Sequence, residues 1–353
     1  MKNIMVVGAS GALGRLVCNE LQRLFDNQIK LIVTDYKMER GKRLADSFNS
    51  DTQFRYLNVD DVDNVKQVIK DVDLVVVILK QKIPAIQKAC IENKIICIDV
   101  TPFYDFAEKV MDLDQGAIRN NIGSVIMSGF FPGLSGLMIK KAIMDFQEVT
   151  EVNMALLQNT NASVGVTGIV DMLNIISQPV TFHNEIEPGF TKKRKMHFVN
   201  HSKGKRVRLI DHSEIRLIHD KLINVQLYYW TSWNNNIFNS IVSLLNKMDL
   251  LKVMQKADKK LLSKTVKHNP NKDETAYLTV EVKGIAGGMK RTKIISAAAS
   301  SDYFTTAMVT AAIAKISLHK NVIGVVCPFE ITNLDEIISI MKSSDLIIEE
   351  FVM

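Results

Sequence analysis

The segment VVGASGALGR, Val6–Arg15, determines how the first third of the chain is interpreted. The apolar run 4–7 precedes it, and the apolar residues of LVCNELQRLF after it recur with helical spacing. Glycines at positions 8, 11 and 14, between a strand and a helix, are typical of the phosphate-binding loop of dinucleotide-binding domains. The alternative is a tight strand-to-helix turn that needs only flexible residues.

Apolar runs alternate with helical patterns over the first 127 residues. Runs such as DLVVVIL are apolar at successive positions, as expected for strands covered on both faces. The predicted strands are 4–7, 29–33, 54–57, 74–79, 95–98 and 124–127, and the predicted helices are 12–24, 38–48, 62–69, 83–92 and 106–119. Strands joined by crossover helices predict an α/β fold with an N-terminal Rossmann domain, a doubly wound parallel sheet.

In this setting each glycine has a separate role. Gly8 allows the tight turn, Gly11 lets the backbone approach a pyrophosphate, and Gly14 lets the helix pack on the sheet. The helix N-terminus then offers free N–H groups and a positive dipole end to the phosphates. The predicted cofactor loop is Gly8, Ala9, Ser10, Gly11, Ala12, Leu13 and Gly14.

Acidic residues follow the second and third predicted strands. Asp35 occupies the position where a carboxylate accepts the adenosine ribose hydroxyls, which favours NAD as the cofactor; otherwise it is a turn or cap residue. Lys37 and Arg40 lie close enough to contact a 2′-phosphate, so NADP stays possible. Asp60 is expected either to border the adenine pocket or to cap the next helix.

Composition limits the class of protein. A chain of 353 residues is long enough for two domains, and its 47% apolar and 23% charged residues are ordinary for a globular protein. The four cysteines are never spaced as CxxC, which indicates reduced thiols and no metal site. Because no segment has the pattern of a signal peptide or a membrane span, we expect a cytoplasmic protein without a membrane partner.

The second half distinguishes two families of nucleotide-binding enzymes. A short-chain dehydrogenase is excluded because none of the seven tyrosines has a lysine four residues later. The G-x-x-P-G turn at 129–133 is followed by hairpin signals, including AYLTVEVKGIAGGMKRTKIIS, and then by DYFTTAMVTAAIAKI and GVVCPFEI. With the GxxGxxG start and the segment 98–101, this order resembles the saccharopine dehydrogenase-like oxidoreductases.

The resemblance implies an NAD(P)-binding Rossmann domain over 1–128 and a mixed α+β substrate-binding and dimerisation domain over 129–353. Its last helix and strand are expected to be able to pack back on the Rossmann domain. It also implies NAD(P)-dependent hydride transfer at a carbon–nitrogen bond of an amino-acid-derived amine or imine, by a homodimer. A non-catalytic dinucleotide-binding sensor or scaffold on the same fold is the alternative.

The carboxyl ends of the strands are where ligands of open parallel sheets bind. The candidates for cofactor contacts there are Leu79, Thr101, Pro132 and Gly133. Hydride transfer at a C–N bond needs a proton acceptor or relay, for which the candidates are Lys80, Asp99 and His183. Thr167, in VGVTGIVDML, resembles the start of the family's helix facing the active site and is the candidate for substrate binding.

The stretch 192–208 carries eight Lys or Arg and no acidic residue. Phosphate-rich partners, a membrane surface or a di- or tricarboxylic substrate would suit such a charge. The favoured interpretation is an exposed hairpin turning at Ser-Lys-Gly, 202–204, with lysine-rich edges that deter aggregation. Only two aromatic residues accompany the cations, so no nucleic-acid partner is expected. The helical segment 236–264 is expected to cover the surface with exposed lysines.

Overall fold

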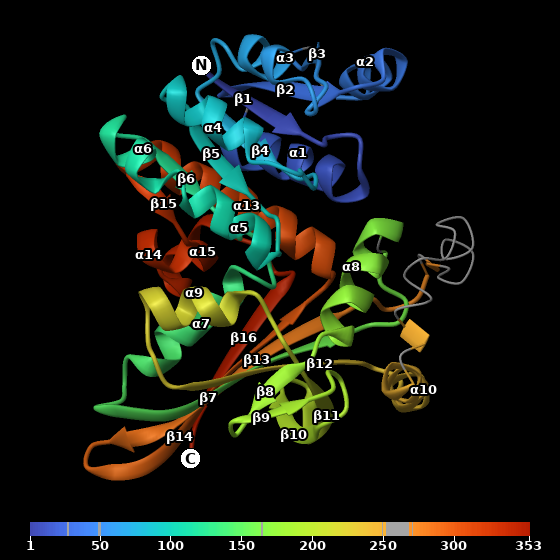
Figure 1. Ribbon diagram of the computed structural model, residues 1–353, viewed down its shortest axis with the longest axis vertical. Helices are drawn as coiled ribbons and strands as arrows, with labels where there is room; N and C mark the ends of the chain where they lie inside the picture. Colours follow the sequence, from blue (N-terminus) through green and yellow to red (C-terminus); the bar gives the residue numbers. More distant parts are fainter. Residues whose placement is uncertain (27, 49–50, 164, 249, 252–267, 270) are drawn as a thin grey trace. The chain divides into compact units, whose positions relative to one another are not determined.

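The computed structural model describes the chain except for residues 27, 49–50, 164, 249, 252–267 and 270 (Figure 1). Of residues 166 and 167 only the backbone is described. The chain forms two compact units. The first unit joins Met1–Leu137 with Thr306–Lys342, and the second joins Met138–Thr305 with Ser343–Met353. Both units are therefore discontinuous in the sequence. The predicted roles of 1–128 and 129–353 stay predictions.

The first unit contains a seven-stranded parallel sheet in the order β15-β6-β5-β4-β1-β2-β3. Its strands are β1 Lys2–Val7, β2 Ile29–Asp35, β3 Gln53–Tyr56, β4 Leu74–Val77, β5 Ile96–Asp99, β6 Gly123–Val125 and β15 Gly324–Val326. The chain proceeds outward from β1 to β3 and then resumes on the other side of β1 at β4. This reversal is the topological switch point of a Rossmann fold.

The helices of the first unit connect these strands. They are α1 Ala12–Phe25, α2 Met38–Asp46, α3 Val62–Val68, α4 Ala85–Glu92, α5 Tyr104–Met111, α6 Asp114–Arg119, α14 Pro328–Ile331 and α15 Leu334–Met341. The ends of two further helices lie in the second unit: α7 Leu134–Ile143 and α13 Asp302–His319. Met5, Val75 and Cys97 of adjacent strands are fully buried and pack against Ile86 and Ala89 of α4. Burial of successive strand residues explains the uninterrupted apolar runs.

Two features of the first unit differ from the sequence prediction. A seventh strand, β15, joins the predicted six and pairs with β6, although about two hundred residues separate them in the chain (Figure 1). A strand of three residues has too little pattern to be assigned from sequence. The predicted helix 106–119 is in fact two helices, because the N–H of Leu113 bonds the carbonyl of Val110 at 3.0 Å and this tighter turn redirects the chain.

The second unit contains a seven-stranded mixed sheet in the order β10-β11-β12-β7-β13-β14-β16. Its strands are β7 Glu148–Gln158, β10 Lys193–Phe198, β11 His201–Ile210, β12 Gln226–Trp233, β13 Ala276–Ala286, β14 Met289–Ala299 and β16 Leu346–Val352. The central strand β7 pairs parallel with β12 and antiparallel with β13. A separate hairpin of β8 Val180–Phe182 and β9 Glu185–Glu187 and the helices α8 Val166–Ser177, α9 Glu214–Lys221 and α10 Asn236–Lys247 complete the described elements.

Two hairpins of this unit were expected from the sequence. The turn at IAGG is confirmed, because Gly287 and Gly288 both have positive φ, 59° and 74°, as a two-residue β13–β14 connection requires. The turn of the basic hairpin was wrongly predicted at 202–204. The chain turns instead at Asn200, which has φ 63°, while Gly204 lies within β11. Asn adopts the left-handed region more readily than most residues, so it competes with glycine for the turn.

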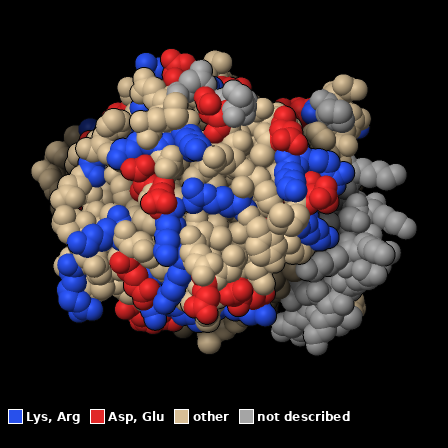
Figure 2. Space-filling view, turned by 90° about the horizontal axis from the view of Figure 1, so that it is seen from above, with Lys and Arg blue, Asp and Glu red and all other residues tan. Residues whose placement is uncertain are grey.

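The predicted fold class is confirmed: a Rossmann-type parallel sheet and a second, mixed α+β unit. On the face seen in Figure 2, Lys and Arg side chains lie among Asp and Glu side chains, without a broad field of one sign. In the described part of the chain, no helix has both the length and the apolar character to cross a membrane.

Candidate dinucleotide-binding site

The glycine loop between β1 and α1 has the geometry of a phosphate cradle. Gly8 has φ 91°, and a Cβ on it would lie 3.3 Å from the backbone of Ile78. A Cβ on Gly14 would meet the carbonyl oxygen of Gly8 at 2.2 Å, so the helix reaches the loop only because this position is glycine. A Cβ on Gly11 would contact only that same carbonyl, at 3.4 Å. The space over Gly11 is therefore open to a ligand.

The start of α1 is suited to an anion. Gly11 is the N-cap residue and has no side chain to bond the first-turn amides. These amides and the positive end of the helix dipole are thus available to phosphate oxygens, and Ala9, Ala12 and Leu13 complete the loop around them. The loop fits a pyrophosphate group.

Asp35 ends β2, and 2% of its side chain is exposed. Arg40 binds it in bidentate fashion, with Nε 2.5 Å from Oδ2 and Nη2 2.7 Å from Oδ1. The hydroxyl of Ser10 also donates to Oδ2, and the amide of Lys37 donates to Oδ1 at 2.8 Å. Burial alone would raise the pKa of Asp35, but the hydrogen bonds from Arg40, Ser10 and Lys37 together lower it. The phosphate loop and the predicted ribose carboxylate are thereby joined through Ser10.

Arg40 and Lys37 lie beside the ring of Tyr36, with the guanidinium carbon 5.3 Å and the Lys37 Nζ 5.7 Å from its centroid. The side chain of Arg40 is 42% exposed, so one side of the guanidinium faces solvent while the other holds Asp35. Asp60 lies on the surface after β3, and the cap of α3 is its neighbour Asp61, which accepts from the amides of Asp63 and Asn64. The capping alternative for Asp60 is therefore wrong.

A buried polar chain lies at the carboxyl end of β5. Asp99 is 1% exposed, and its carboxylate accepts from the amide of Thr101 at 2.6 Å and from the side chain of Gln87. The amide of Gln81 in turn donates to Gln87 at 3.1 Å. Burial raises the pKa of Asp99 to about 6, and the hydrogen bonds from Thr101 and Gln87 oppose that rise. Asp99 holds the backbone at Thr101 in place and is shielded from solvent.

The turn after β6 is closely packed. A Cβ on Gly133, where φ is 122°, would lie 2.3 Å from the carbonyl oxygen of Gly129. The amide of Gly129 donates to the carbonyl of Pro132 at 3.0 Å, and the Thr306 hydroxyl lies 3.3 Å from the amide of Phe130. Pro132 and Gly133 are both buried. The backbone at the carboxyl end of β6 therefore has a fixed path beside the strand ends that carry Leu79 and Thr101.

The three candidate catalytic residues are divided between the two units. Lys80 is exposed after β4, and its Nζ lies 4.2 Å from the centroid of the Phe103 ring. Asp99 is buried in the same unit, whereas His183 belongs to the second unit. His183 and Asn184 have φ 49° and 67° and form the tight turn between β8 and β9, where His183 Nδ1 lies 3.3 Å from the Tyr228 hydroxyl. His183 is therefore a residue of the β8–β9 turn.

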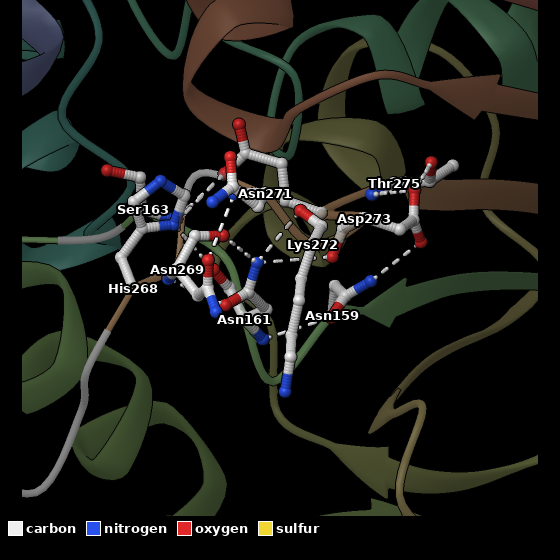
Figure 3. A network of polar contacts seen from close by, with 10 residues as sticks. Asn159, Asn161, Ser163, His268, Asn269, Asn271, Lys272, Asp273 and Thr275 are labelled. Carbon is white, nitrogen blue, oxygen red and sulfur yellow. Dashed lines mark hydrogen bonds and ion pairs between the residues drawn. The ribbon is translucent and has the colours of Figure 1, made fainter.

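Thr167 lies in the first turn of α8, and its side chain lies outside the described part of the structure. The loop that leads to this helix is held by the polar network in Figure 3. The side-chain amide of Asn161 donates to the carbonyls of Asn269 and Lys272, both at 3.0 Å, and Asn159 donates to Asp273 at 3.0 Å. The network joins the end of β7 to the segment before β13.

Gln81 and Gln87 are the site residues that sequence reasoning missed. The signal was a polar residue on the buried side of a short helix, since Gln87 is 0% exposed within α4. A buried amide needs partners, and the carboxylate at the end of the next strand is one of them. The described residues contain no group of His, Cys, Asp and Glu that could hold a metal ion.

Comparison with known proteins identifies the first unit. Residues 4–125 match the family described as the saccharopine dehydrogenase NADP binding domain. This part of the chain is therefore similar to the NADP-binding domains of saccharopine dehydrogenases. The predicted resemblance and the prediction of a nicotinamide dinucleotide cofactor, NAD(P), are thereby confirmed, and an NAD(P)-linked oxidoreductase is supported.

A solved structure is similar in fold to the whole chain and not only to residues 4–125. The apo saccharopine dehydrogenase (L-Glu forming) of Saccharomyces cerevisiae has a TM-score of 0.76 and 14% identity, with 100% of both chains covered. The DAP dehydrogenase of C. glutamicum has a TM-score of 0.49 and 12% identity, with 96% of this chain and 98% of that chain covered. At such identities, the yeast structure establishes the fold. No curated protein sequence matches the chain.

Proposed function

We propose that the protein is an NAD(P)-dependent oxidoreductase that transfers hydride at the carbon–nitrogen bond of an amino-acid-derived amine or imine. The phosphate cradle with its linked Asp35 carries this proposal, and the fold shared with the yeast saccharopine dehydrogenase is consistent with the proposed reaction class. When bound, the nicotinamide would accept or deliver the hydride. We further propose that the active enzyme is a homodimer and lies in the cytoplasm.

In the proposed site, the loop from Gly8 to Leu13 binds the pyrophosphate, Gly14 lets α1 pack close to it, and Ser10 keeps Asp35 oriented towards the ribose of the adenosine. The turn at Pro132 and Gly133, together with Leu79 and Thr101, forms the wall against which the nicotinamide ring packs. Asp99 acts as a positioning residue, because it is buried and bonded to the backbone of Thr101. Asp60 stays the candidate for the border of the adenine pocket.

Lys80 is the candidate in the first unit for proton transfer or for binding a substrate carboxylate, because it is exposed at the carboxyl end of β4. The Lys80 ammonium lies over the Phe103 ring, a cation–π contact. We therefore give Lys80 the role of contacting substrate, with Thr167 as a second candidate. His183 remains a candidate for proton transfer, although its position in the β8–β9 turn favours a structural role.

The arrangement of Arg40 gives the proposal a test of cofactor choice. Arg40 neutralises Asp35, which would otherwise repel a 2′-phosphate. Calorimetric titration with NADH and NADPH should therefore show that Arg40→Ala binds NADPH at least about tenfold more weakly, because a lost charge-assisted contact is worth about 1.5–3 kcal/mol. Asp35→Ala should weaken the binding of NADH more than the binding of NADPH. If neither dinucleotide binds the unaltered protein, the oxidoreductase proposal is wrong.

Turnover distinguishes an enzyme from a sensor. The unaltered protein, supplied with cofactor, should oxidise a secondary amine or reductively couple an amino acid and a 2-oxo acid within a broad panel. Lys80→Met should then lower kcat/KM by about 10²–10⁴-fold, the range for a lost acid–base group, with cofactor affinity retained. Lys82→Met, an exposed lysine two residues away, is the matched control. Tight cofactor binding without turnover on any pair would favour the sensor.

A further inference from the structure

Helix α10 exposes its apolar side and buries its polar side. Ile237, Ile241 and Leu244 of the helix and Met248, the residue at its C-cap, are 74%, 52%, 58% and 59% exposed. The buried positions of the same helix are Asn239, Val242, Ser243 and Asn246. A surface helix of a globular protein normally has the opposite arrangement, with its apolar stripe towards the core.

Polar anchors fix the helix in this orientation. Asn239 accepts from the amide of Trp233 at 2.9 Å and donates to the same residue's carbonyl at 2.7 Å. The amide of Asn246 donates to the carbonyls of Ile176 and Gly189 at 3.0 and 2.6 Å, and Asn235 caps the first turn. The exposed stripe is therefore built into the fold, since these specific bonds hold the polar side inward.

The exposed stripe, Ile237, Ile241, Leu244 and Met248, has the geometry of a surface that contacts a partner. Its four residues recur at intervals of four, three and four, so they form one line along the helix, about 16 Å long at 1.5 Å per residue. Phe238 is 41% exposed beside them, and a shallow hollow lies along Ile237, Ser240, Ile241 and Leu244. Contiguous exposed apolar side chains of this kind mark a surface that contacts another apolar phase or partner.

Cations flank the stripe. In the β10–β11 hairpin, Lys193 lies opposite Arg208 and Lys195 opposite Arg206, so like charges face each other across the strands. Arg208 reaches α10, with Nη2 3.4 Å from the Ser240 hydroxyl. Repulsion by Arg208 is the first cause of the lowered pKa of Lys193, followed by burial and by Arg206 and Lys247. Within the described ranges, Lys193, Lys195, Arg206 and Lys247 have no ion-pair partner.

An anionic lipid surface fits both features. Aliphatic side chains enter the boundary between headgroups and acyl chains, while neighbouring lysines and arginines meet lipid phosphates. A second copy of the chain fits less well, because two antiparallel α10 helices in a two-fold contact would bring the Lys193 clusters of both copies to the same side. We propose that α10 and the adjacent cations, Lys193, Lys195, Arg206 and Lys247, dock the protein on anionic membranes.

This proposal departs from the sequence expectation of no membrane partner. Helical spacing shows that 236–247 is amphipathic, but it does not show which side faces outward. The segment was expected to cover the surface with exposed lysines, whereas the described exposed residues of α10 are mostly apolar, and 252–264 lies largely outside the described residues. The contact is peripheral, with α10 lying in the plane of the surface.

Flotation with lipid vesicles tests the proposal on the full-length protein. We expect binding to phosphatidylcholine vesicles containing about one-third phosphatidylglycerol, and little binding to phosphatidylcholine alone. The double variant Ile241→Asp and Leu244→Asp should lose the bound fraction. Ile186→Asp, at an isolated isoleucine that is 80% exposed on β9, is the matched control and should bind like the unaltered protein. The triple variant Lys193→Gln, Lys195→Gln and Lys247→Gln should bind on the order of a hundredfold more weakly.

Three outcomes would overturn the proposal. One is the absence of binding to anionic vesicles at low salt by protein with an unaltered thermal transition. Another is equal binding to neutral and anionic vesicles, which would remove the role of the cations. The third is that the unaltered protein does not bind vesicles at all and is a dimer that the Ile241→Asp and Leu244→Asp variant converts to a monomer. That result would assign the stripe to contact with a second copy of the chain.

Discussion

At the scale of single residues, the three loop glycines differ in what a side chain would meet. Gly14→Ala places a methyl group 2.2 Å from the carbonyl oxygen of Gly8, so β1 and α1 must separate. We expect this variant to lose about 1–3 kcal/mol in its free energy of unfolding, as overpacking typically costs. Gly11→Ala is the matched control, because its Cβ meets one atom at 3.4 Å.

The same pair separates packing from ligand binding. Gly11→Ala should stay within about 1 kcal/mol of the unaltered protein in urea unfolding, the cost of alanine at an N-cap. Its affinity for NADPH should nevertheless fall, because the methyl group enters the space above the loop. Equal stability of the two variants would contradict the steric argument, and unchanged affinity in Gly11→Ala would contradict the assignment of that space to the pyrophosphate.

Asp99 predicts a pH dependence of stability. Its pKa in the folded protein is about 6, above the ordinary value of 3.8, so folding favours the protonated form. Its contribution is complete below the unfolded pKa and is lost as pH rises through 6. Relative to Asp99→Asn, which stays neutral, the unaltered protein should lose about 2.5 kcal/mol between pH 4 and 8. Urea unfolding of both proteins across this pH range checks the prediction. A difference in their free energies of unfolding that does not change with pH would contradict it.

At the scale of elements, sequence pattern was informative where local physics decides the structure. The strand and helix order of the first 127 residues, the phosphate loop and the Gly287–Gly288 turn follow from apolar periodicity and from positions that need glycine. Two kinds of contact could not be predicted. The pairing of β15 with β6 joins segments about two hundred residues apart. The bonds of Arg40 to Asp35 and of Trp233 to Asn239 join residues only five and six positions apart, but they depend on how the side chains pack.

The catalytic candidates illustrate the same limit. Asp99 and Lys80 were selected because they follow predicted strands, and the structure does place both near the strand ends. Nothing in the sequence indicated that Gln87 would bury and saturate Asp99, or that His183 would occupy a two-residue turn of the other unit. Position along a strand can be predicted from local pattern, whereas exposure of the side chain there depends on its neighbours.

At the scale of the whole molecule, the first unit depends on residues near the end of the chain. Thr310 of α13 donates to the carbonyl of Ser128 at 2.8 Å, and Lys315 donates to that of Leu24 at 2.8 Å. We predict that residues 1–137 alone do not unfold cooperatively or bind NADPH. Joining them to 306–342 through a Gly/Ser linker of about ten residues should restore both properties. Circular dichroism during urea unfolding and a cofactor titration test this, and a cooperative, NADPH-binding 1–137 fragment would contradict it.

The divided first unit has a consequence for synthesis in the cell. Ribosomes add about 5–20 residues per second, and roughly two hundred residues separate Leu137 from the last residue of the unit, Lys342. The glycine loop and the strands around it are thus made about 10–40 s before α13 and β15 emerge. During that interval the edge of β6 that later pairs with β15 has no neighbouring strand, and an unpaired strand edge of this kind is prone to aggregate while the chain folds.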